Sequence, residues 1–443
     1  MKSLNNFFGV EAHGTTVRTE ILGGVATFLT MAYIFFVNPS IIISAIPGIG
    51  PEIYSQFFGA IMVATIIAAA SATLIMSLWA NYPFVLAPGM GLNAYFTYTV
   101  CLKMGIDWRV ALGAVFVEGI IFGLITLLGV RAFIVSALPK SVKFATGAGI
   151  GLFLAFIGMK NGNIISSDEN TFVTLGNIHS PEAIVTIIGL LIITSLFSLK
   201  VPGSILIGIL LATGLGAFLG ITKFHGIVGA IPDVSRTFMQ LKISWSDLVT
   251  PTFWVVVMTF FFADFFDTAG TLTGLSTSAG LSDKDGNLPR SDRAFMADAV
   301  GTVIGAVFGT SAVTAYIESG AGIAQGARTG LASLVCSILM LLTLFFSPLA
   351  SSIPASATAP ALIFIGALMM VHLKNINWDD TTEALPAFIT VVTMPLTFSI
   401  ANGIALGILS YAAIKLVSGR FKEGHWMTYL LAILFALYFT YFH

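Results

Sequence analysis

Three carboxylates lie in stretches of the sequence that are otherwise apolar. Asp264 and Asp267 lie in FFFADFFDTAGTLTG, and Glu318 lies in AVTAYIES. An ionised Asp at the centre of a membrane span costs at least about 2.5 to 3.5 kcal/mol. No Lys or Arg stands deep in either stretch, so a salt bridge would need Lys103 or Arg328 to reach inward. We therefore expect these carboxylates to face a cavity.

The spacing of the carboxylates suggests what they do there. Asp264 and Asp267 are three residues apart, which places both on one face of a helix, and Thr271 continues the same stripe. Burial and mutual repulsion allow carboxyl groups in such a site to hold and release protons. Proton binding by Asp264, Asp267 and Glu318 is therefore our first prediction.

Other polar residues in the apolar stretches have simpler explanations. Glu118 in FVEGIIFG and Asp298 in FMADAVGTVIG are better explained by hydrogen bonds between helices than by contact with a ligand. Cys101 and Cys336 show neither a CxxC pair nor the spacing of metal ligands. No motif for nucleophilic or metal-dependent catalysis occurs in a suitable context. The sequence thus predicts no metal, no cofactor and no enzymatic activity.

The composition indicates a polytopic membrane protein. Of the 443 residues, 56% are hydrophobic and only 9% are charged, whereas a soluble protein would have roughly a quarter of its residues charged. The net charge of −1 gives no basic surface for nucleic acid. The N-terminal residues lack the apolar core of a cleavable signal, so we expect the first span itself to direct insertion into the lipid bilayer.

Fourteen apolar runs are long enough to cross about 30 Å of hydrocarbon, which predicts an all-α fold. The runs cover residues 21–44, 57–80, 84–101, 109–130, 142–159, 182–199, 203–222, 249–273, 294–309, 311–327, 329–348, 357–371, 386–417 and 426–442. The run 386–417 contains Pro395 and Gly403, and it is either one broken element or a tight pair.

Lys and Arg in short loops predict the orientation of the chain in the membrane. Counting the spans puts three basic clusters on one side, which we place in the cytoplasm together with the N-terminus. The clusters are Lys2 and Arg18; Arg131, Lys140 and Lys143; and Lys284, Arg290 and Arg293. The same count puts Arg420 and Lys422 on the opposite side, which leaves the course of the C-terminal segment open.

Two pairs of segments, each seven spans apart, resemble one another. GLNAYFTY in the third span matches AVTAYIES in the tenth, with Asn93 on Thr314, and ATFLTMAYIF in the first span matches MTFFFADFFD in the eighth. A repeat with an odd number of spans is inverted in the membrane, as in secondary transporters. Gly and Pro also interrupt the third and tenth spans, which lipid tolerates only where protein or a cavity surrounds the backbone. We expect the two halves to meet at a site near the midplane.

Five blocks of the sequence resemble the AzgA-like adenine/guanine/hypoxanthine permeases, a branch of the nucleobase-ascorbate transporter and xanthine-uracil permease superfamily. The blocks are HGTTVRTEILGGVATFLTMAYIFFVNP, ANYPFVLAPGMGLNAYF, FFDTAGTLTG, TSAVTAYIESGAGIAQGARTGL and PAFITVVTMPLTFSIANGIALG. The resemblance implies a proton-coupled importer of purine nucleobases in the bacterial inner membrane. It also implies two inverted seven-span repeats, with short strands in spans three and ten. A core domain (1–130 and 246–348) would move against a gate domain (131–245 and 349–443) in an elevator mechanism.

The resemblance also implies the residues of the binding site. Asp267 of FDTAG matches the substrate carboxylate of the family, Glu318 of AYIES matches its acidic partner, and Asn93 of GLNAYF matches its polar contact. Relatives are not uniform at the place of Asp264, so proton coupling is assigned to Glu318 and Asp267 with Asp264 as a third candidate. The other predicted binding residues, which include aromatic rings for the purine face, are Tyr316, Ile317, Phe262, Thr271 and Tyr95.

Three other classes of protein fit the sequence less well. An anion transporter of the same fold would need a cation or helix N-termini facing its substrate, rather than carboxylates. A channel would need a continuous polar lining, and an intramembrane aspartyl protease would bring its two carboxylates from separate helices. The sequence does not choose among adenine, guanine, hypoxanthine and xanthine, and it leaves a homodimer open.

Overall fold

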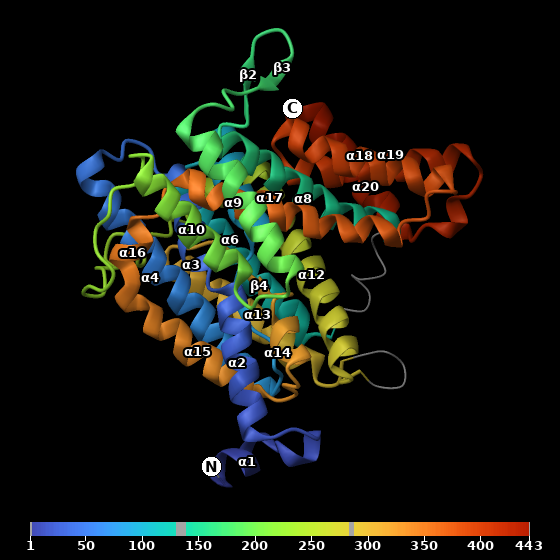
Figure 1. The fold of residues 1–443 in the computed structure, drawn as a ribbon. Helices are drawn as coiled ribbons and strands as arrows, with labels where there is room; N and C mark the ends of the chain where they lie inside the picture. The colour runs from blue at the N-terminus through green and yellow to red at the C-terminus, as the bar shows by residue number, and fades with distance from the viewer. Residues whose placement is uncertain (1, 130–138, 283–287, 443) are drawn as a thin grey trace.

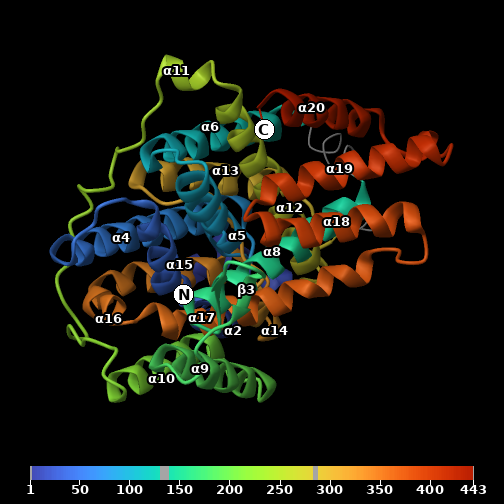
Figure 2. The same cartoon turned by 90° about the horizontal axis from the view of Figure 1, so that it is seen from above.

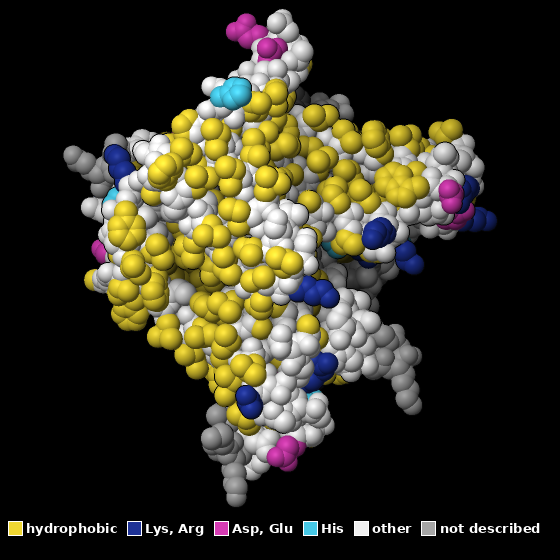
Figure 3. All heavy atoms as spheres, viewed as in Figure 1, with side chains coloured by type: hydrophobic (Ala, Val, Ile, Leu, Met, Phe, Trp, Pro, Cys, Tyr) yellow, Lys and Arg dark blue, Asp and Glu magenta, His cyan; other side chains and the backbone are white. Residues whose placement is uncertain are grey.

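The computed structural model describes residues 2–129, 139–282 and 288–442, and most of the chain in these ranges is helical (Figure 1). Within them, nine helices are long and apolar enough to cross a bilayer. Hydrophobic side chains cover much of the face in Figure 3, with a few Lys and Arg side chains among them, and the Asp and Glu side chains lie at its margins. The protein is therefore a multi-pass membrane protein, as predicted, while the count of fourteen spans stays a prediction.

One group of helices comes from the first and third quarters of the chain. It contains α2 (Val17–Met31), α3 (Ile34–Ile42), α4 (Pro51–Ile75), α5 (Met90–Ala94), α6 (Trp108–Leu127), α12 (Pro251–Ala279), α13 (Ser291–Phe308), α14 (Ser319–Ala324) and α15 (Gly330–Leu342). Helix α13 packs against α4 and α6, α12 packs against α6, and α15 packs against α2 and α4. Among the shorter helices, α11 (Trp245–Leu248) and α16 (Ser347–Ser351) lie at the edge of this group in Figure 2, and α1 (Lys2–Phe8) lies beyond the end of α2 in Figure 1.

The second group comes from the second and fourth quarters. It contains α8 (Lys140–Asn161), α9 (Pro181–Ser198), α10 (Ser204–Phe218), α17 (Ala355–Met369), α18 (Thr381–Thr397), α19 (Ile400–Val417) and α20 (Trp426–Phe442). Helices α8 and α17 pack together, the pair α9 and α10 packs on α17, and the pair α18 and α19 packs on α8 (Figure 2). The same three-helix arrangement thus occurs twice, as expected for two repeats.

Two short strands join the halves at the centre of the molecule. Strand β1 (Leu86–Pro88) pairs with β4 (Val313–Ala315) in antiparallel register, with Leu86 opposite Ala315. The strands approach so closely that a Cβ at Gly89 would lie 2.8 Å from Thr314 Cγ2, which explains a glycine at this position. The predicted strands in the third and tenth spans are confirmed.

The third and tenth spans correspond, but the predicted match of Asn93 with Thr314 was wrong. Ala87 lies opposite Thr314 in the sheet, so Ala87 and not Asn93 occupies the position equivalent to Thr314. Asn93 lies in α5, which follows its strand, whereas Thr314 lies within a strand. A short apolar match does not distinguish a strand from the helix after it.

The run 386–417 is a tight pair of helices, α18 and α19. They separate at Phe398, whose φ of 50° breaks the helix, and Ser399 caps α19. Arg420 binds Asp380 at 2.8 Å, so the end of α19 meets the start of α18.

The C-terminal basic residues lie at the same end of the molecule as Lys140. A cavity of about 630 Å³ is lined by both Lys140 and Lys422. The sequence left the course of this segment open, and the count that put Arg420 and Lys422 on the opposite side had treated α18 and α19 as one span. Arg131 and Lys284 lie outside the described residues.

A β-hairpin that the sequence did not predict lies between α8 and α9. Strands β2 (Ile165–Asp168) and β3 (Phe172–Leu175) are antiparallel, and the hairpin projects from the molecule (Figure 1). The Asp168 carboxylate accepts hydrogen bonds from the backbone of Asn170 (2.9 Å) and Thr171 (2.8 Å). These bonds fix the turn and lower the pKa of Asp168.

Candidate substrate site

The structure brings Asp267 and Glu318 together. Asp267 lies near the middle of α12, Glu318 directly precedes α14, and both side chains are half-buried. Helix α12, which carries Asp267, packs against α14, which begins directly after Glu318. Glu318 Oε1 accepts a hydrogen bond of 2.6 Å from the Tyr33 hydroxyl, and the Glu318 carbonyl accepts one of 3.3 Å from Thr30. The first, eighth and tenth predicted spans therefore converge on one acidic site.

Asn93 and the two predicted tyrosines lie deeper. Asn93 is fully buried and its Oδ1 accepts a hydrogen bond from the Ser311 hydroxyl. Its amide nitrogen has no hydrogen-bond partner among the described residues, so it can still donate. The Tyr316 hydroxyl donates to the Pro88 carbonyl at 2.6 Å, and Tyr95 packs edge-on against Phe260. Both tyrosine rings are buried in the core of this structure.

Ile317, Phe262 and Thr271 lie at the accessible edge of the same region. Ile317, the neighbour of Glu318, is 62% exposed, while Phe262 and Thr271 are half-buried on α12. Phe262 stacks on Phe266 with an interplanar angle of 6°. Ile317 thus offers apolar surface beside Glu318, while Phe262 and Thr271 stay predicted contacts of the substrate.

Asp264 does not share the exposure of Asp267. Its side chain is completely buried, and its Oδ2 lies 3.5 Å from the Thr302 hydroxyl on α13. Two residues three apart on a helix point about 60° apart around the axis. Because of this angle, Asp264 faces the neighbouring helices and is buried, whereas Asp267 is only half-buried.

The cations that could have neutralised this site bind elsewhere. Lys103 donates to the Thr397 carbonyl, and Arg328 donates to the carbonyls of Ile323 (2.8 Å) and Ala327 (2.7 Å). No group of His, Cys, Asp and Glu in the searched part of the chain is arranged to hold a metal. Among the described residues, the hydrogen-bond donor to the Glu318 carboxylate is therefore the Tyr33 hydroxyl rather than a cation.

Two cavities of the structure lie away from this site. One, of about 380 Å³, lies between α6 and α12 and is lined by residues such as Asp107 and Phe253. The other is the cavity of about 630 Å³ beside Lys140. Neither is lined by Asp267 or Glu318, so we define the candidate site by its side chains.

Sequence reasoning missed Tyr33, whose hydroxyl is the hydrogen-bond donor to Glu318. Tyr33 lies in ATFLTMAYIF, the segment that matched the eighth span, so the repeat contained a signal for it. For Asp298 the predicted helix-to-helix bond is confirmed, because the Thr268 hydroxyl of α12 donates to it. For Glu118 the same prediction is wrong within the described residues, because neither of its carboxyl oxygens has a hydrogen-bond partner there.

The fold and the site define a class, a membrane transporter built from inverted repeats as a core and a gate. The transmembrane domain of the cyanobacterium bicarbonate transporter BicA has this fold, with a TM-score of 0.65 at 18% identity over 88% of this chain and 97% of that one. The protein is a transporter and not an enzyme.

The sequence identifies the family within this class. The profile of the permease family (Xan_ur_permease) matches residues 18–406, and the chain belongs to this family. It is 45% identical over 439 residues to the guanine/hypoxanthine permease PbuG of Bacillus subtilis, covering 99% of this chain and 100% of PbuG. It is 41% identical over 435 residues to the adenine permease AdeQ of Escherichia coli, covering 98% of this chain and 96% of AdeQ. The predicted family resemblance is confirmed.

Proposed function

We propose that the protein is a proton-coupled symporter that imports purine nucleobases such as adenine, guanine or hypoxanthine. The relatives named as guanine/hypoxanthine and adenine permeases support the substrate class. The observation that carries the proposal is the packing of α12, which carries Asp267, against α14, which follows Glu318, with Tyr33 of the first half donating to Glu318. Glu318 accepts its hydrogen bond from a hydroxyl group, that of Tyr33, rather than from a cation.

The chemistry of the site fits a purine. A purine presents N–H donors and ring-nitrogen acceptors along its edge, and carboxylates accept from the donors. The free amide N–H of Asn93 can donate to a ring nitrogen or carbonyl. Phe262 and Ile317 offer apolar surface to the flat ring. An acidic site of this kind would repel an inorganic anion.

Coupling follows from the two neighbouring carboxyl groups. A neutral purine binds more favourably when one of them, Glu318, carries a proton, since two like charges then no longer face each other. Proton and purine therefore increase each other's affinity. Tyr33 accompanies this change, because its hydroxyl can donate to the carboxylate or accept from the acid.

Transport follows if a core domain (1–130 and 246–348) moves against a gate domain (131–245 and 349–443). The separate packing of α6, α12 and α13 and of α8, α17 and α18 supports this division. We place the protein in the bacterial inner membrane with its N-terminus in the cytoplasm. The proposal holds for a monomer and for a homodimer.

Uptake in a bacterial strain that lacks its own purine permeases tests the proposal. Cells expressing the protein should take up radiolabelled hypoxanthine or adenine, and unlabelled purine bases should compete. Uracil, nucleosides and phosphate should not compete, and phosphate in particular should be repelled by the Asp267 and Glu318 carboxylates. Cells that take up none of the four labelled purines, despite protein in the membrane, would refute it.

The alternative is an anion transporter, which the shared fold of the bicarbonate transporter BicA favours. The same cells decide between the two. Inhibition of purine uptake by bicarbonate or sulfate, or uptake of labelled bicarbonate itself, would support the alternative.

A further inference from the structure

A second group of carboxyl groups lies behind the substrate site, where three helices meet. Glu118 on α6, Asp264 on α12 and Asp298 on α13 each have no exposed side-chain surface. The charge of Asp264 interacts with those of Glu118 and Asp298, and Glu118 also interacts with Asp298. We call these three residues the inner carboxyl group.

The inner carboxyl group lacks the partners that buried carboxylates need. Both oxygens of Glu118, Oδ1 of Asp264 and Oδ1 of Asp298 have no hydrogen-bond partner in the described ranges. Over the same ranges, no Lys, Arg or His is in ion-pair contact with them. Taking one ionised carboxylate out of water costs several kcal/mol when no partner compensates it.

Glu20 provides the contrast within the same protein. It is as completely buried as Glu118, but its carboxylate accepts backbone hydrogen bonds from Arg328 (2.7 Å), Thr329 (3.3 Å) and Ala332 (3.3 Å). A buried carboxylate with three donors can keep its charge. Glu118 has no such donors, so burial favours its neutral acid.

Aromatic rings close one side of the inner carboxyl group. Phe122 contacts Phe261, Phe265 and Phe295 at centroid distances of 5.9, 5.6 and 6.0 Å. Each ring is one turn or less along its helix from a member of the group. These rings are themselves buried and limit access of water to the carboxyl groups.

Threonine hydroxyls connect the inner carboxyl group to the substrate site. Thr268 donates to Asp298, lies 2.8 Å from the Thr314 hydroxyl and accepts from the Ala315 amide at 3.3 Å. The Thr302 hydroxyl, beside Asp264, accepts from the Val313 amide at 2.9 Å. Strand β4 therefore contacts both carboxylate–threonine pairs, and it directly precedes Tyr316 and Glu318.

We propose that Glu118, Asp264 and Asp298 form a buried proton-binding site, separate from the Asp267 and Glu318 site and linked to it through β4. This role rests on the proposed function, since it adds a proton store to proton-coupled uptake. The charge of Asp267 interacts with those of Asp264 and Asp298, so ionisation at one site changes proton affinity at the other. Carboxyl groups that share protons in this way titrate together.

Infrared spectroscopy of the purified protein without purine tests the proton-binding site directly. At neutral pH the wild type should show the carbonyl band of protonated carboxylic acids, and Glu118→Gln should lose part of it. Glu20→Gln, the matched control, should leave the band unchanged. A wild type without an acid band, or a band that Glu118→Gln does not alter, would overturn the proposal whether or not purine is the substrate.

Proton uptake on purine binding tests the link to transport. In weak buffer with a pH indicator, wild type and Glu20→Gln should take up the same number of protons per bound purine, and Glu118→Gln should take up fewer. Asp298→Asn provides a second test if Glu118→Gln does not fold. Equal proton uptake by all variants, or a purine affinity that depends on sodium instead of pH, would contradict the proposal. If the wild type binds no purine, the proposed function is refuted, but the infrared test of the buried proton-binding site is unaffected.

Discussion

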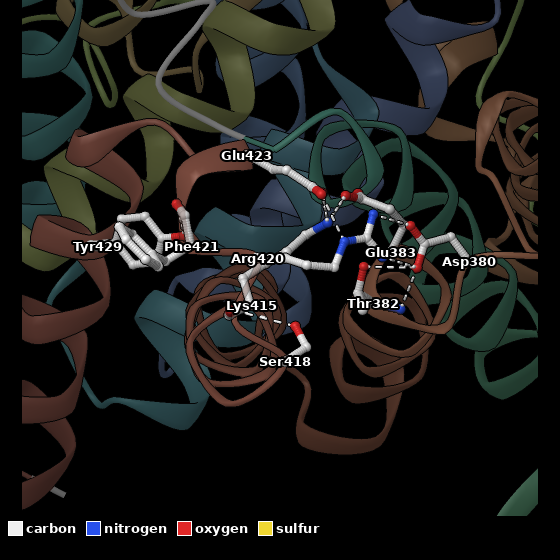
Figure 4. Close-up of polar contacts among 9 residues, drawn as sticks. All are labelled: Asp380, Thr382, Glu383, Lys415, Ser418, Arg420, Phe421, Glu423 and Tyr429. Carbon is white, nitrogen blue, oxygen red and sulfur yellow. Dashed lines mark hydrogen bonds and ion pairs between the residues drawn. The ribbon is translucent and has the colours of Figure 1, made fainter.

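Two acidic regions of the protein differ in what surrounds them. Asp267, Glu318 and the inner carboxyl group have hydroxyl partners or none. At the end of the α18–α19 pair, every carboxylate binds a cation (Figure 4). This second region, which we call the gate-end cluster, consists of Asp380, Glu383, Lys415, Arg420 and Glu423.

The gate-end cluster has the geometry of a structural clamp. Lys415 is 1% exposed and binds Glu383 at 3.0 Å and Glu423 at 2.7 Å. Arg420 binds both oxygens of Asp380, at 3.0 and 2.8 Å. Each of the three carboxylates in the cluster thus binds one or both of its two cations, and these ion pairs join the start of α18 to the end of α19. The comparison separates carboxylates that bind cations and hold α18 to α19 from carboxylates without a cation, which are the ones we propose to bind purine or protons.

The largest expected effect comes from neutralising the exposed member of the unmatched region. Asp267→Asn removes a charge-assisted acceptor, which contributes about 1.5 to 3 kcal/mol. Purine uptake should fall at least about tenfold, while the amount of folded protein in the membrane stays the same. Uptake by the variant at the wild-type rate would remove Asp267 from the site.

A more selective effect is expected from Glu318→Gln. The amide keeps hydrogen bonds to purine and Tyr33 but cannot release a proton, so purine binding should lose only part of its strength. Accumulation against a gradient should fail, while counterflow, which exchanges purine without net proton movement, should survive better.

The control for Glu318→Gln is the wild type treated with an uncoupler, which should accumulate no more purine than the variant does. If Glu318→Gln still concentrates purine under an imposed pH gradient, the coupling proton belongs to Asp267 or Asp264.

A substitution in the gate-end cluster should lower the stability of the protein and leave its proton coupling unchanged. Lys415→Met leaves Glu383 and Glu423 without their buried cation, so the midpoint of thermal unfolding should fall. Proton coupling per transported purine should stay at the wild-type value. Lys422→Met, at an exposed lysine on the same side, is the control and should change neither quantity. A Lys415→Met variant that keeps its thermal stability but transports a different number of protons per purine would contradict this distinction between the two regions.

The smallest effect is a pH dependence of stability. Hydrogen bonds from Arg420 and then Lys415 lower the pKa of Glu423 to about 2, and bonds from Arg420 and Thr382 lower the pKa of Asp380. Groups that are more acidic when folded add stability above their ordinary pKa of about 4. This stability is lost as the pH falls from about 4 to about 2.

Arg420→Gln tests this dependence. The variant should lose less of its thermal stability than the wild type does between neutral pH and about pH 3, because its carboxylates are no longer held in the charged form. Parallel pH profiles for the two proteins would show that these bonds do not contribute to stability.

The sequence predicted the features that depend on local composition. Apolar length located the membrane segments, and the repeat together with the family resemblance predicted the strands and the meeting of Asp267 with Glu318. The break at Phe398 was harder to place, because a positive φ at an aromatic residue has no sequence signal. Pro395 marked the region but not the residue.

The remaining contacts join residues that are far apart in the chain. Tyr33 and Glu318 are separated by 285 residues, and Thr268 and Asp298 come from different helices. Which side of α12 buries Asp264 depends on the packing of α12 against α6 and on the contact of Asp264 with Thr302 of α13, which periodicity on one helix does not give. For the same reason, the sequence could not predict that both carboxyl oxygens of Glu118 lack a hydrogen-bond partner among the described residues, because its neighbours come from other helices.

Purine transport by the purified protein in vesicles tests the central claim most directly. With a pH gradient that is acidic outside and with no sodium, labelled hypoxanthine or adenine should accumulate inside above its external concentration. The internal pH should fall as purine enters, and an uncoupler should abolish the accumulation. Purine that merely equilibrates across the membrane under the same gradient, or a gradient-driven uptake of bicarbonate instead, would contradict the account.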